Sequence, residues 1–428
     1  MSKLDNLIAK LCPNGVVYKK VGEVCQTITD YTAAGSFGDI AKNVKYINNR
    51  IGFAQLIRTT DLKSDFDNPD KFVYVDEKAY KYLWRVNLNS EGLVMPNVGN
   101  CGEVYYITPE SLPHENNVLG PNAIWVRSNT VLIRYLFHLF LAKEFQNKLA
   151  KIISPTGQTK FNKTNFKELT IPVPPLEVQR EIVRVLDNFT LLTAELTAEL
   201  TAELTARRKQ YEYYADALFP SLKDSDVDWV DVGEIATVTK LAGFEFTKYV
   251  TYSKTGKIIA LRGLNVKNGH LILDDVKYVD NSELSMLSRS KLKIDDMLFT
   301  YVGTVGQVAI IEENDKYYLA PNVALVRIND NSFLSKYMMY YFLTKKFKNE
   351  QILKLLQASS MQNIPMEKIR KFKLPCISVT EQNRVVSILD KFDGLTNDIS
   401  IGIPAEITAR QKQYEYYRDK LLTFKEAR

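Results

Sequence analysis

Two short polar loops, at residues 157–163 and 359–363, gather amide, hydroxyl and amino side chains in the two halves of the chain. Gln and Asn can form paired hydrogen bonds with adenine, and Lys or Arg can do so with guanine. These loops are therefore our first candidates for contact with base edges in duplex DNA. The candidate residues are Gln158, Thr159, Lys160, Asn162, Lys163, Ser359, Ser360, Gln362 and Asn363.

Two glycine loops supply a second set of candidates. A Val-Gly-x-x-Gly pattern occurs at residues 98–102 and again at residues 302–306. The polar residues on or beside these loops are second choices for base contact, and they are Asn97, Asn100, Tyr301 and Thr304. Arg58 and Arg262 also occur at matching places in the two halves. Two interpretations of this pair stay open, namely contact with a duplex and a structural salt bridge kept in both copies.

Lysine and arginine side chains collect near the end of each half, between residues 134 and 167 and between residues 336 and 373. Such charge suits contact with phosphates, which adds affinity without sequence information. An ordinary solvated helix face explains any single lysine equally well. Charge alone therefore does not define the site.

A nuclease is one alternative, because Asp70 and the run at residues 76–78 (Asp-Glu-Lys) match a loose pattern for holding a divalent metal. The second half keeps Asp280 but has Asn281 and Ser282 at the next two positions. Short patterns of this kind also arise by chance. No GxxxxGK[ST] phosphate loop occurs, which argues against ATP hydrolysis. We therefore expect no catalytic residue and no metal site.

A long helix is expected at residues 176–218, which should position these loops. Leucines recur every four residues, at Leu192, Leu196, Leu200 and Leu204, in the repeat LTAELTAELTAELTA. This spacing places them along one side of a helix, and the segment is too long for a strand. Each four-residue step overshoots the 3.6-residue turn by about 40°, so the stripe should wind around the helix.

The long helix is duplicated at an offset of 203 residues. The sequence KQYEYY occurs at residues 209–214 and 412–417, and the four leucines meet Leu or Ile in the copy. Two helices with matching apolar stripes are expected to bury them against each other. The alternative is that each helix packs on its own globular domain. Gly402 and Pro404 predict a kink or break near residues 400–404 of the second helix.

The part of each half that precedes its long helix has mixed α and β character. Runs at residues 104–107, 123–126 and 308–311 have the composition of strands. Single helices are expected at residues 132–152 and 334–356. A short N-terminal helix should end at the turn signal Pro-Asn-Gly.

The predicted fold class is α+β. Two similar mixed α/β domains, at residues 1–170 and 220–373, are joined by two long antiparallel α-helices, at residues 171–219 and 374–428. These helices form a coiled-coil-like pair, and an approximate two-fold axis relates the domains. The two ends of the chain should then lie close together. A pseudo-two-fold molecule suits a two-fold ligand, and duplex DNA is the obvious one.

The composition is that of a folded protein with more than one domain. The chain has 428 residues, 45% of them hydrophobic, and a net charge of +6 that permits nucleic-acid binding without demanding it. Its four cysteines lack metal-binding spacing and fit a reducing compartment, so we expect a cytoplasmic location. The longest apolar run, near residues 132–142, is too short to span a bilayer, and no membrane partner is expected.

The whole chain resembles the specificity subunits of type I restriction–modification systems. The resemblance rests on the duplicated entry into each long helix (residues 171–179 and 374–382), the duplicated KQYEYY exit and the TAEL repeat, which is similar to that of one subgroup. It implies that the two domains are target-recognition domains, each of which reads one half of a split DNA sequence. It also implies that the helices act as a spacer and as a docking surface.

The same resemblance implies partners and cofactors. The chain itself would be non-catalytic and bind no cofactor, whereas S-adenosylmethionine, ATP and Mg would serve two modification subunits and the restriction subunits. The predicted partner-binding residues are Arg207, Lys209, Tyr211, Tyr214, Lys412, Tyr414 and Tyr417. These tyrosines are expected to mix partner docking with helix packing, because neighbours on a helix face different sides. A coiled-coil scaffold that binds no DNA is a further alternative, but it leaves two divergent domains on one plan unexplained.

Overall fold

The chain folds into two compact units. The computed structural model describes residues 3–48, 50–154, 158–241, 243–283, 288–356, 363–396 and 402–427. Unit 1 consists of Met1–Ala198 together with Thr408–Arg428, and unit 2 consists of Glu199–Ile407. Each unit therefore combines a globular domain with parts of two long helical segments.

The globular domain of unit 1 is built on two sheets. Its strands are β2 (Thr27–Asp30), β3 (Ala54–Ile57), β4 (Tyr74–Val75), β5 (Gly92–Pro96), β6 (Tyr105–Ile107), β7 (Asn117–Leu119) and β8 (Ala123–Arg127). A four-stranded antiparallel sheet has the order β2–β8–β5–β6, and a three-stranded sheet has the order β4–β3–β7, in which β3 and β7 are parallel. The short helices are α2 (Val21–Val24), α3 (Phe37–Asn43), α4 (Thr59–Lys63), α5 (Glu77–Tyr82) and α8 (Lys163–Lys167).

The domain of unit 2 repeats this plan. Its strands are β11 (Ala236–Lys240), β12 (Ile259–Leu261), β15 (Lys277–Tyr278), β16 (Met297–Thr300), β17 (Val308–Ile310), β18 (Tyr317–Leu319) and β19 (Val323–Ile328). The sheet orders are β11–β19–β16–β17 and β15–β12–β18, with β12 and β18 parallel. The short helices are α10 (Val232–Ile235), α11 (Gly243–Tyr249) and α14 (Met366–Arg370), and β13 (Val266–Lys267) and β14 (His270–Leu271) form a hairpin. The duplication predicted from the sequence is thus confirmed in the sheet topology.

A two-stranded ribbon lies at the entry to each long helical segment. In unit 1, β1 (Tyr18–Lys20) pairs with β9 (Thr170–Pro172), and in unit 2, β10 (Trp229–Asp231) pairs with β20 (Lys373–Pro375). Both pairs are antiparallel, and the second strand of each pair, β9 or β20, ends at a proline. The ribbons therefore join the first strand of each domain to the start of its long helix.

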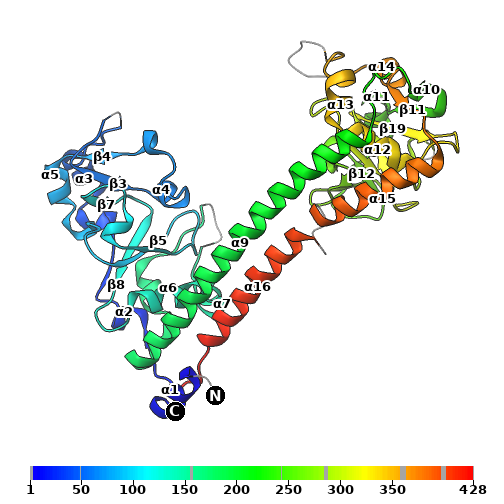
Figure 1. Cartoon of the computed structure of the whole chain (residues 1–428). Helices are drawn as coiled ribbons and strands as arrows, with labels where there is room; N and C mark the ends of the chain where they lie inside the picture. The colour runs from blue at the N-terminus through cyan, green and yellow to red at the C-terminus, as the bar shows by residue number, and fades with distance from the viewer. Residues whose placement is uncertain are drawn as a thin grey trace. The chain divides into compact units, whose positions relative to one another are not determined.

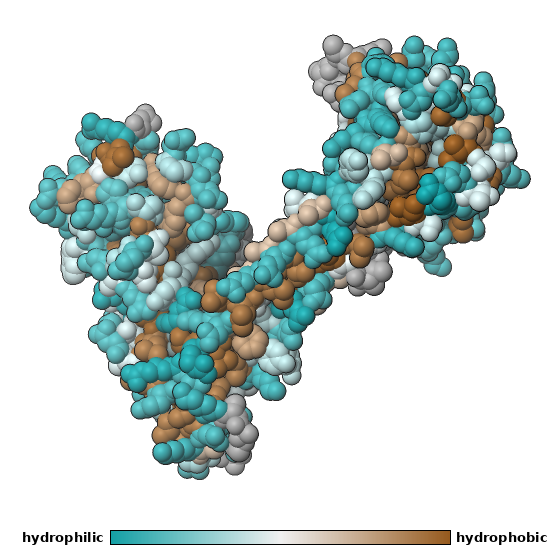
Figure 2. Space-filling view, viewed as in Figure 1, coloured by the Kyte–Doolittle hydropathy of each residue, from teal (hydrophilic) through white to brown (hydrophobic). Residues whose placement is uncertain are grey.

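The first long helix, α9 (Leu176–Leu218), spans 43 residues and has the predicted bounds (Figure 1). Its first turns bury Val178, Ile182 and Leu186 in the core of unit 1. The leucine stripe is buried only in part, because Leu192 is 62% exposed, and hydrophobic surface remains visible along the long helices (Figure 2). The other three leucines of the stripe, Leu196, Leu200 and Leu204, are half-buried. In the described part of the chain, no helix combines the length and apolarity needed to cross a membrane.

The long helices pair within each unit. In unit 1, the ring of Phe189 lies 5.7 Å from that of Tyr417 in α16 (Ile403–Leu421). In unit 2, Tyr214 stacks on Phe392 of α15 (Val379–Thr396) at 5.6 Å. The start of α9 thus meets α16, and its end meets α15. This is the antiparallel pairing that the matching apolar stripes predict.

The second helical segment is interrupted where Gly402 and Pro404 predict a break. Residues 397–401 lie outside the described part of the chain, and Gly402 is not helical. The carbonyl of Gly402 accepts hydrogen bonds from the N–H groups of Ala405 and Glu406 at 3.0 and 3.2 Å. Pro404 therefore lies in the first turn of α16, where its missing N–H costs no helical hydrogen bond.

The prediction of one unbroken helix at residues 132–152, and of another at residues 334–356, is wrong. The first is divided into α6 (Ile133–Leu141) and α7 (Lys143–Ala150), and the second into α12 (Ser335–Leu343), α13 (Lys345–Phe347) and a π-helical turn at Lys348–Ile352. Ala142 and Thr344 are extended, with ψ of 144° and 152°. The first N–H of the helix that follows each of them donates to an aspartate at the end of a long helix. In unit 2, the hydroxyl of Thr344 also caps the helix, because it accepts a hydrogen bond from the N–H of Phe347 at 3.1 Å.

The two ends of the chain pair with each other, as predicted. After α1 (Lys3–Leu11), the N–H of Val16 donates to the carbonyl of Lys425 at 2.8 Å. The N–H of Ala427 donates to the carbonyl of Val16 at 2.9 Å. Both termini belong to unit 1 and lie side by side (Figure 1).

Candidate nucleic-acid interface

The glycine loop and the polar loop of unit 1 are bonded to each other through their backbones. Val98 and Lys160 form an antiparallel bridge, and the N–H of Gly99 donates to the carbonyl of Thr159 at 2.8 Å. The N–H of Phe161 donates to the carbonyl of Asn97 at 3.1 Å. Two sets of residues that the sequence analysis ranked separately thus form one surface.

This surface of unit 1 is open to solvent. The side chains of Asn100, Gln158, Thr159 and Lys160 are exposed. Gly99 has φ of +85°, a backbone conformation that favours glycine, and a Cβ added there would meet no other atom within 4 Å. The loop therefore offers the amides of Asn100 and Gln158 and the ammonium group of Lys160 to solvent, as base contacts require, whereas the hydroxyl of Thr159 donates to the carbonyl of Gly99.

Unit 2 has the same arrangement at the matching place. Val302 and Asn363 form an antiparallel bridge, and the N–H of Ile364 donates to the carbonyl of Tyr301 at 2.9 Å. Thr304 is exposed on the glycine loop. The predicted residues Ser359, Ser360 and Gln362 lie outside the described residues.

Three predicted residues are held in the fold. Tyr301 is 9% exposed, burial raises its pKa, and Lys240 Nζ lies 5.5 Å from its ring centre. Asn162 accepts a hydrogen bond from the N–H of Asn165 at 2.7 Å and so caps α8. Lys163 forms an ion pair of 2.8 Å with Asp30. These three side chains therefore support the two loops, and base contact by them stays a prediction.

The structure distinguishes the two interpretations of the arginine pair, contact with a duplex and a structural salt bridge, in the case of Arg58. Arg58 donates from Nε and Nη2 to the carboxylate of Asp61, at 3.0 and 2.6 Å, and Asp61 is 4% exposed. The hydrogen bond to Asp61 raises the pKa of Arg58. Arg58 is thus held in a structural salt bridge. At the matching place in unit 2, Asn265 replaces the aspartate, and Arg262 has no equivalent two-atom pair with it.

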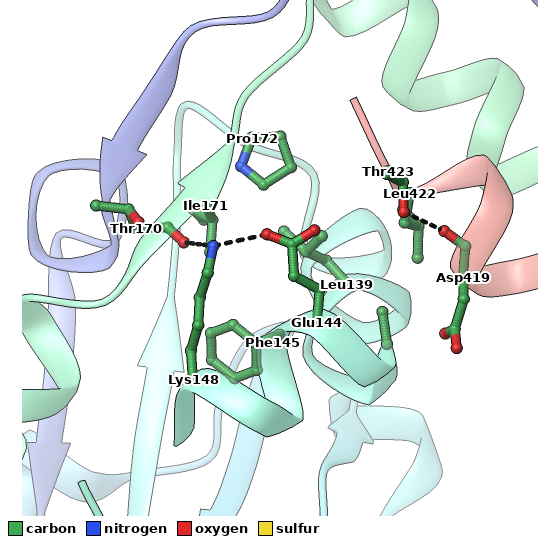
Figure 3. A pocket seen from close by; sticks show the side chains of 11 residues that line it. Leu139, Glu144, Phe145, Lys148, Thr170, Ile171, Pro172, Asp419, Leu422 and Thr423 are labelled. Carbon is green, nitrogen blue, oxygen red and sulfur yellow. Dashed lines mark hydrogen bonds and ion pairs between the residues drawn. The ribbon is translucent and has the colours of Figure 1, made fainter. Parts of the chain in front are cut away.

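Some of the basic side chains near the end of each domain form ion pairs and hydrogen bonds within the protein. Lys148 Nζ lies 2.8 Å from a carboxylate oxygen of Glu144 and donates to the carbonyl of Thr170 at 3.1 Å (Figure 3). The pocket beside it, which Asp419 of α16 also lines, has a volume of about 20 Å³, close to the room that one water needs. Lys148 therefore joins α7 to β9.

The predicted partner-binding tyrosines all contact the neighbouring long helix, while Tyr214 and Tyr417 remain 41% and 37% exposed. Tyr211 and Tyr214 pack on Phe392, Tyr417 packs on Phe189, and Tyr414 Oη lies 3.1 Å from Thr190 Oγ1. From the sequence, Tyr213 and Tyr416, the middle tyrosines of the two KQYEYY runs, have the same two interpretations, docking and helix packing. They face outward and are 70% and 61% exposed. Arg207 bonds to Glu203 and Gln210, while Lys209 and Lys412 are exposed.

Two of the residues that suggested a nuclease, Asp76 and Glu77, have structural partners. Asp76 accepts a hydrogen bond from the N–H of Ala79 at 2.8 Å and so caps α5. Glu77 pairs with Lys81 at 2.6 Å. In the described part of the chain, no group of three or more His, Cys, Asp or Glu side chains is placed to hold a metal ion.

Comparison with known proteins identifies the family. The family described as "Type I restriction modification DNA specificity domain" matches twice, at residues 13–206 and 225–409. A putative type I restriction enzyme specificity subunit of Haemophilus influenzae is 32% identical over 68% of this chain and 72% of its own length. The EcoR124I/EcoR124II specificity subunit of Escherichia coli is 33% identical over 61% of this chain and 65% of its own length.

A solved structure shares the fold. A chain from a structure titled for the complex assembly and conformational transition of a type I R-M system matches with a TM-score of 0.65 and 15% identity, over 96% of this chain and 98% of that one. Because the family model matches twice, at residues 13–206 and 225–409, the chain belongs to the type I restriction–modification DNA specificity family.

Proposed function

We propose that this chain is the sequence-reading subunit of a type I restriction–modification complex. Each unit reads one half of a bipartite DNA site, and the paired long helices set the gap between the halves. The observation that supports this most directly is that the same two-sheet domain occurs twice, each time with a glycine loop bonded to a polar loop. Two readers on one plan suit the two-fold character of duplex DNA.

The chain contributes recognition, and its partners contribute catalysis. Two modification subunits dock on the helix pairs, one on each, and restriction subunits join them. Exposed aromatic residues are common in the centre of protein interfaces, so Tyr213 and Tyr416 are the side chains we assign to docking, beside Lys209 and Lys412. S-adenosylmethionine, ATP and Mg serve those partners in the cytoplasm, and this chain binds none of them.

The first test is base preference in the assembled complex. Gln158→Ala, studied with modification subunits present, should relax the preference at one or two positions in one half-site and leave the other half and the gap unchanged. Glu195→Gln, an exposed change on α9, is the matched control and should leave the whole site unchanged. Equal binding of the unaltered complex to all duplexes would contradict the proposal.

A further inference from the structure

The glycine loop of unit 1 is held at both of its glycines. The N–H of Gly99 donates to the carbonyl of Thr159 in the polar loop at 2.8 Å. At the other end, Nε2 of Gln146 in α7 donates to the carbonyl of Gly102 at 2.9 Å. The exposed residue Asn100 therefore lies between two anchored glycines.

The two glycines make such anchors necessary. Gly99 and Gly102 have φ of +85° and +111°, in a region that other residues rarely adopt. Because glycine has many accessible backbone conformations, a residue between two glycines keeps one position only where neighbouring groups hold it. The side chain of Gln146 also occupies the space beside Gly102, since a Cβ added there would lie 2.9 Å from Gln146 Oε1. Gln146 therefore limits the positions that the loop can adopt.

The amide of Gln146 is itself fixed in orientation. Its Nε2 donates a second hydrogen bond, at 2.6 Å, to the carbonyl of Phe140 in the last turn of α6. Carbonyl oxygens only accept hydrogen bonds, so both partners require the amino group of the amide, and both of its N–H donors are used. Carbonyls at the end of a helix lack a partner within the helix, which makes an outside donor favourable there. Gln146 thus joins the glycine loop to α6 and α7.

Unit 2 supports its glycine loop in a different way. Gly306, which matches Gly102, faces a methyl carbon, because a Cβ added there would lie 2.7 Å from Cδ1 of Ile352. Ile352 ends the π-helical turn at Lys348–Ile352, whereas α7 is an α-helix. Counted from the capped lysines at positions 143 and 345, the residue that matches Gln146 is Lys348. A change at Gln146 should therefore act on unit 1 alone.

We propose that Gln146 acts through Asn100 as a positioning residue for base recognition, an inference that rests on the proposed function. Asn100 offers an amide that can pair with a base edge, and such pairing depends on direction as well as distance. Loss of the anchor at Gly102 leaves this amide present but gives it a wider range of orientations. The base preference of unit 1 should then weaken at the position that Asn100 reads and stay unchanged elsewhere.

Gln146→Met tests this, because methionine keeps the length of glutamine and removes its donors. Each variant is assembled with modification subunits, and binding selection on duplexes with both halves randomised maps its site. Asn100→Ala should weaken the preference at one base position about ten- to hundredfold, and Gln146→Met should weaken it there about two- to tenfold. The double variant should lose no more at that position than Asn100→Ala alone. Gln26, which bonds to Asn129 in the same unit, supplies the matched control, and Gln26→Met should leave both half-sites unchanged.

The pattern of loss separates the outcomes. A shared position for Asn100→Ala and Gln146→Met, without further loss in the double variant, supports the inference. An equal loss of affinity for all sequences in Gln146→Met means that its bonds only stabilise the fold, and this overturns the inference. A loss at a different position, or an unchanged site in either variant, also overturns it while the unaltered complex keeps its sequence preference. Absence of any preference in the unaltered complex overturns the proposed function as well.

Discussion

The carboxylate of Asp216 accepts a hydrogen bond from the backbone N–H of Lys345 at 2.8 Å, across 129 residues of sequence. Asp419 accepts the equivalent bond from Lys143 at 3.1 Å. In both units, the end of a long helix thus caps the first turn of a short helix in the globular domain. These bonds tie the helical and globular parts of each unit together.

Removal of such a capping aspartate should lower the stability of the unit that contains it. Asp216→Ala is expected to lower the free energy of unfolding of unit 2 by about 1 kcal/mol, and Asp216→Asn by less, because asparagine also caps helices. Thermal unfolding followed by circular dichroism measures the change. Asp274→Ala, at an exposed carboxylate of the same unit, is the control and should have little effect. Equal stability of the two alanine variants would refute the cap.

The stability of unit 1 should depend on pH through His138. This ring is fully buried, its Nε2 lies 2.7 Å from Asp187, and burial lowers its pKa while the bond to Asp187 partly opposes the shift. The folded state therefore favours neutral histidine. The contribution of His138 to the free energy of unfolding should be complete above the pKa of histidine in the unfolded chain, about 6.5. It should decline as the pH falls below that value.

Unit 2 suggests the variant that tests this. Tyr340 occupies the matching place and donates to Asp390 without titrating near neutral pH. His138→Tyr should therefore flatten the pH dependence of unfolding between about pH 5 and 6.5. Denaturant titrations of the two proteins at several pH values measure this. The prediction fails if both lose stability equally as the pH is lowered.

Gly92 in β5 has no room for a side chain. A Cβ added there would lie 2.4 Å from the ring of Trp125, which is 1% exposed and packed in the core. Gly92→Ala should lower the free energy of unfolding by about 1–3 kcal/mol through overpacking. Gly243→Ala, where a Cβ meets no atom within 4 Å, is the comparison and should not destabilise the protein. Differential scanning calorimetry distinguishes the two.

The length of α9 should set the gap between the half-sites. Deletion of residues 197–200, one TAEL unit, shortens the helix by about 6 Å, which corresponds to about two base pairs of 3.4 Å. A methylation map of a host carrying the variant should show a shorter gap and unchanged half-sequences. Insertion of one TAEL unit should lengthen the gap. An unaltered gap in the deletion variant contradicts the role of α9 as a spacer.

Local patterns predict the parts of the fold that local chemistry determines. The four-residue leucine spacing predicts the long helix α9, and Gly402 with Pro404 predicts the interruption before α16. The helix after Ala142 is capped instead by the distant Asp419, whereas the helix after Thr344 is capped both by the distant Asp216 and by Thr344 itself. No window of sequence around Ala142 contains its aspartate, so a single helix was the natural expectation there. At Thr344 a local signal was present, because threonine is a favoured N-cap residue.

The predictions for the site divide in the same way, into features set by local residue types and features set by tertiary structure. Residue type identified the glycine loop and the polar loop of each unit, but the bridge from Val98 to Lys160 crosses 62 positions and follows from tertiary structure. The arginine pair is different, because the signal was in the sequence. Arg58 is followed after three positions by an aspartate and Arg262 by an asparagine, and a comparison of the two copies predicts different roles.

Unit 1 is discontinuous in sequence, since residues 408–428 complete it and Leu422 lies in its core. Unit 2 is one unbroken stretch, residues 199–407. On the ribosome, unit 2 can therefore finish folding while the earlier-made unit 1 still waits for its last helix. The domain that is translated first is the one completed last, and until then its unfilled core is exposed to chaperones and proteases.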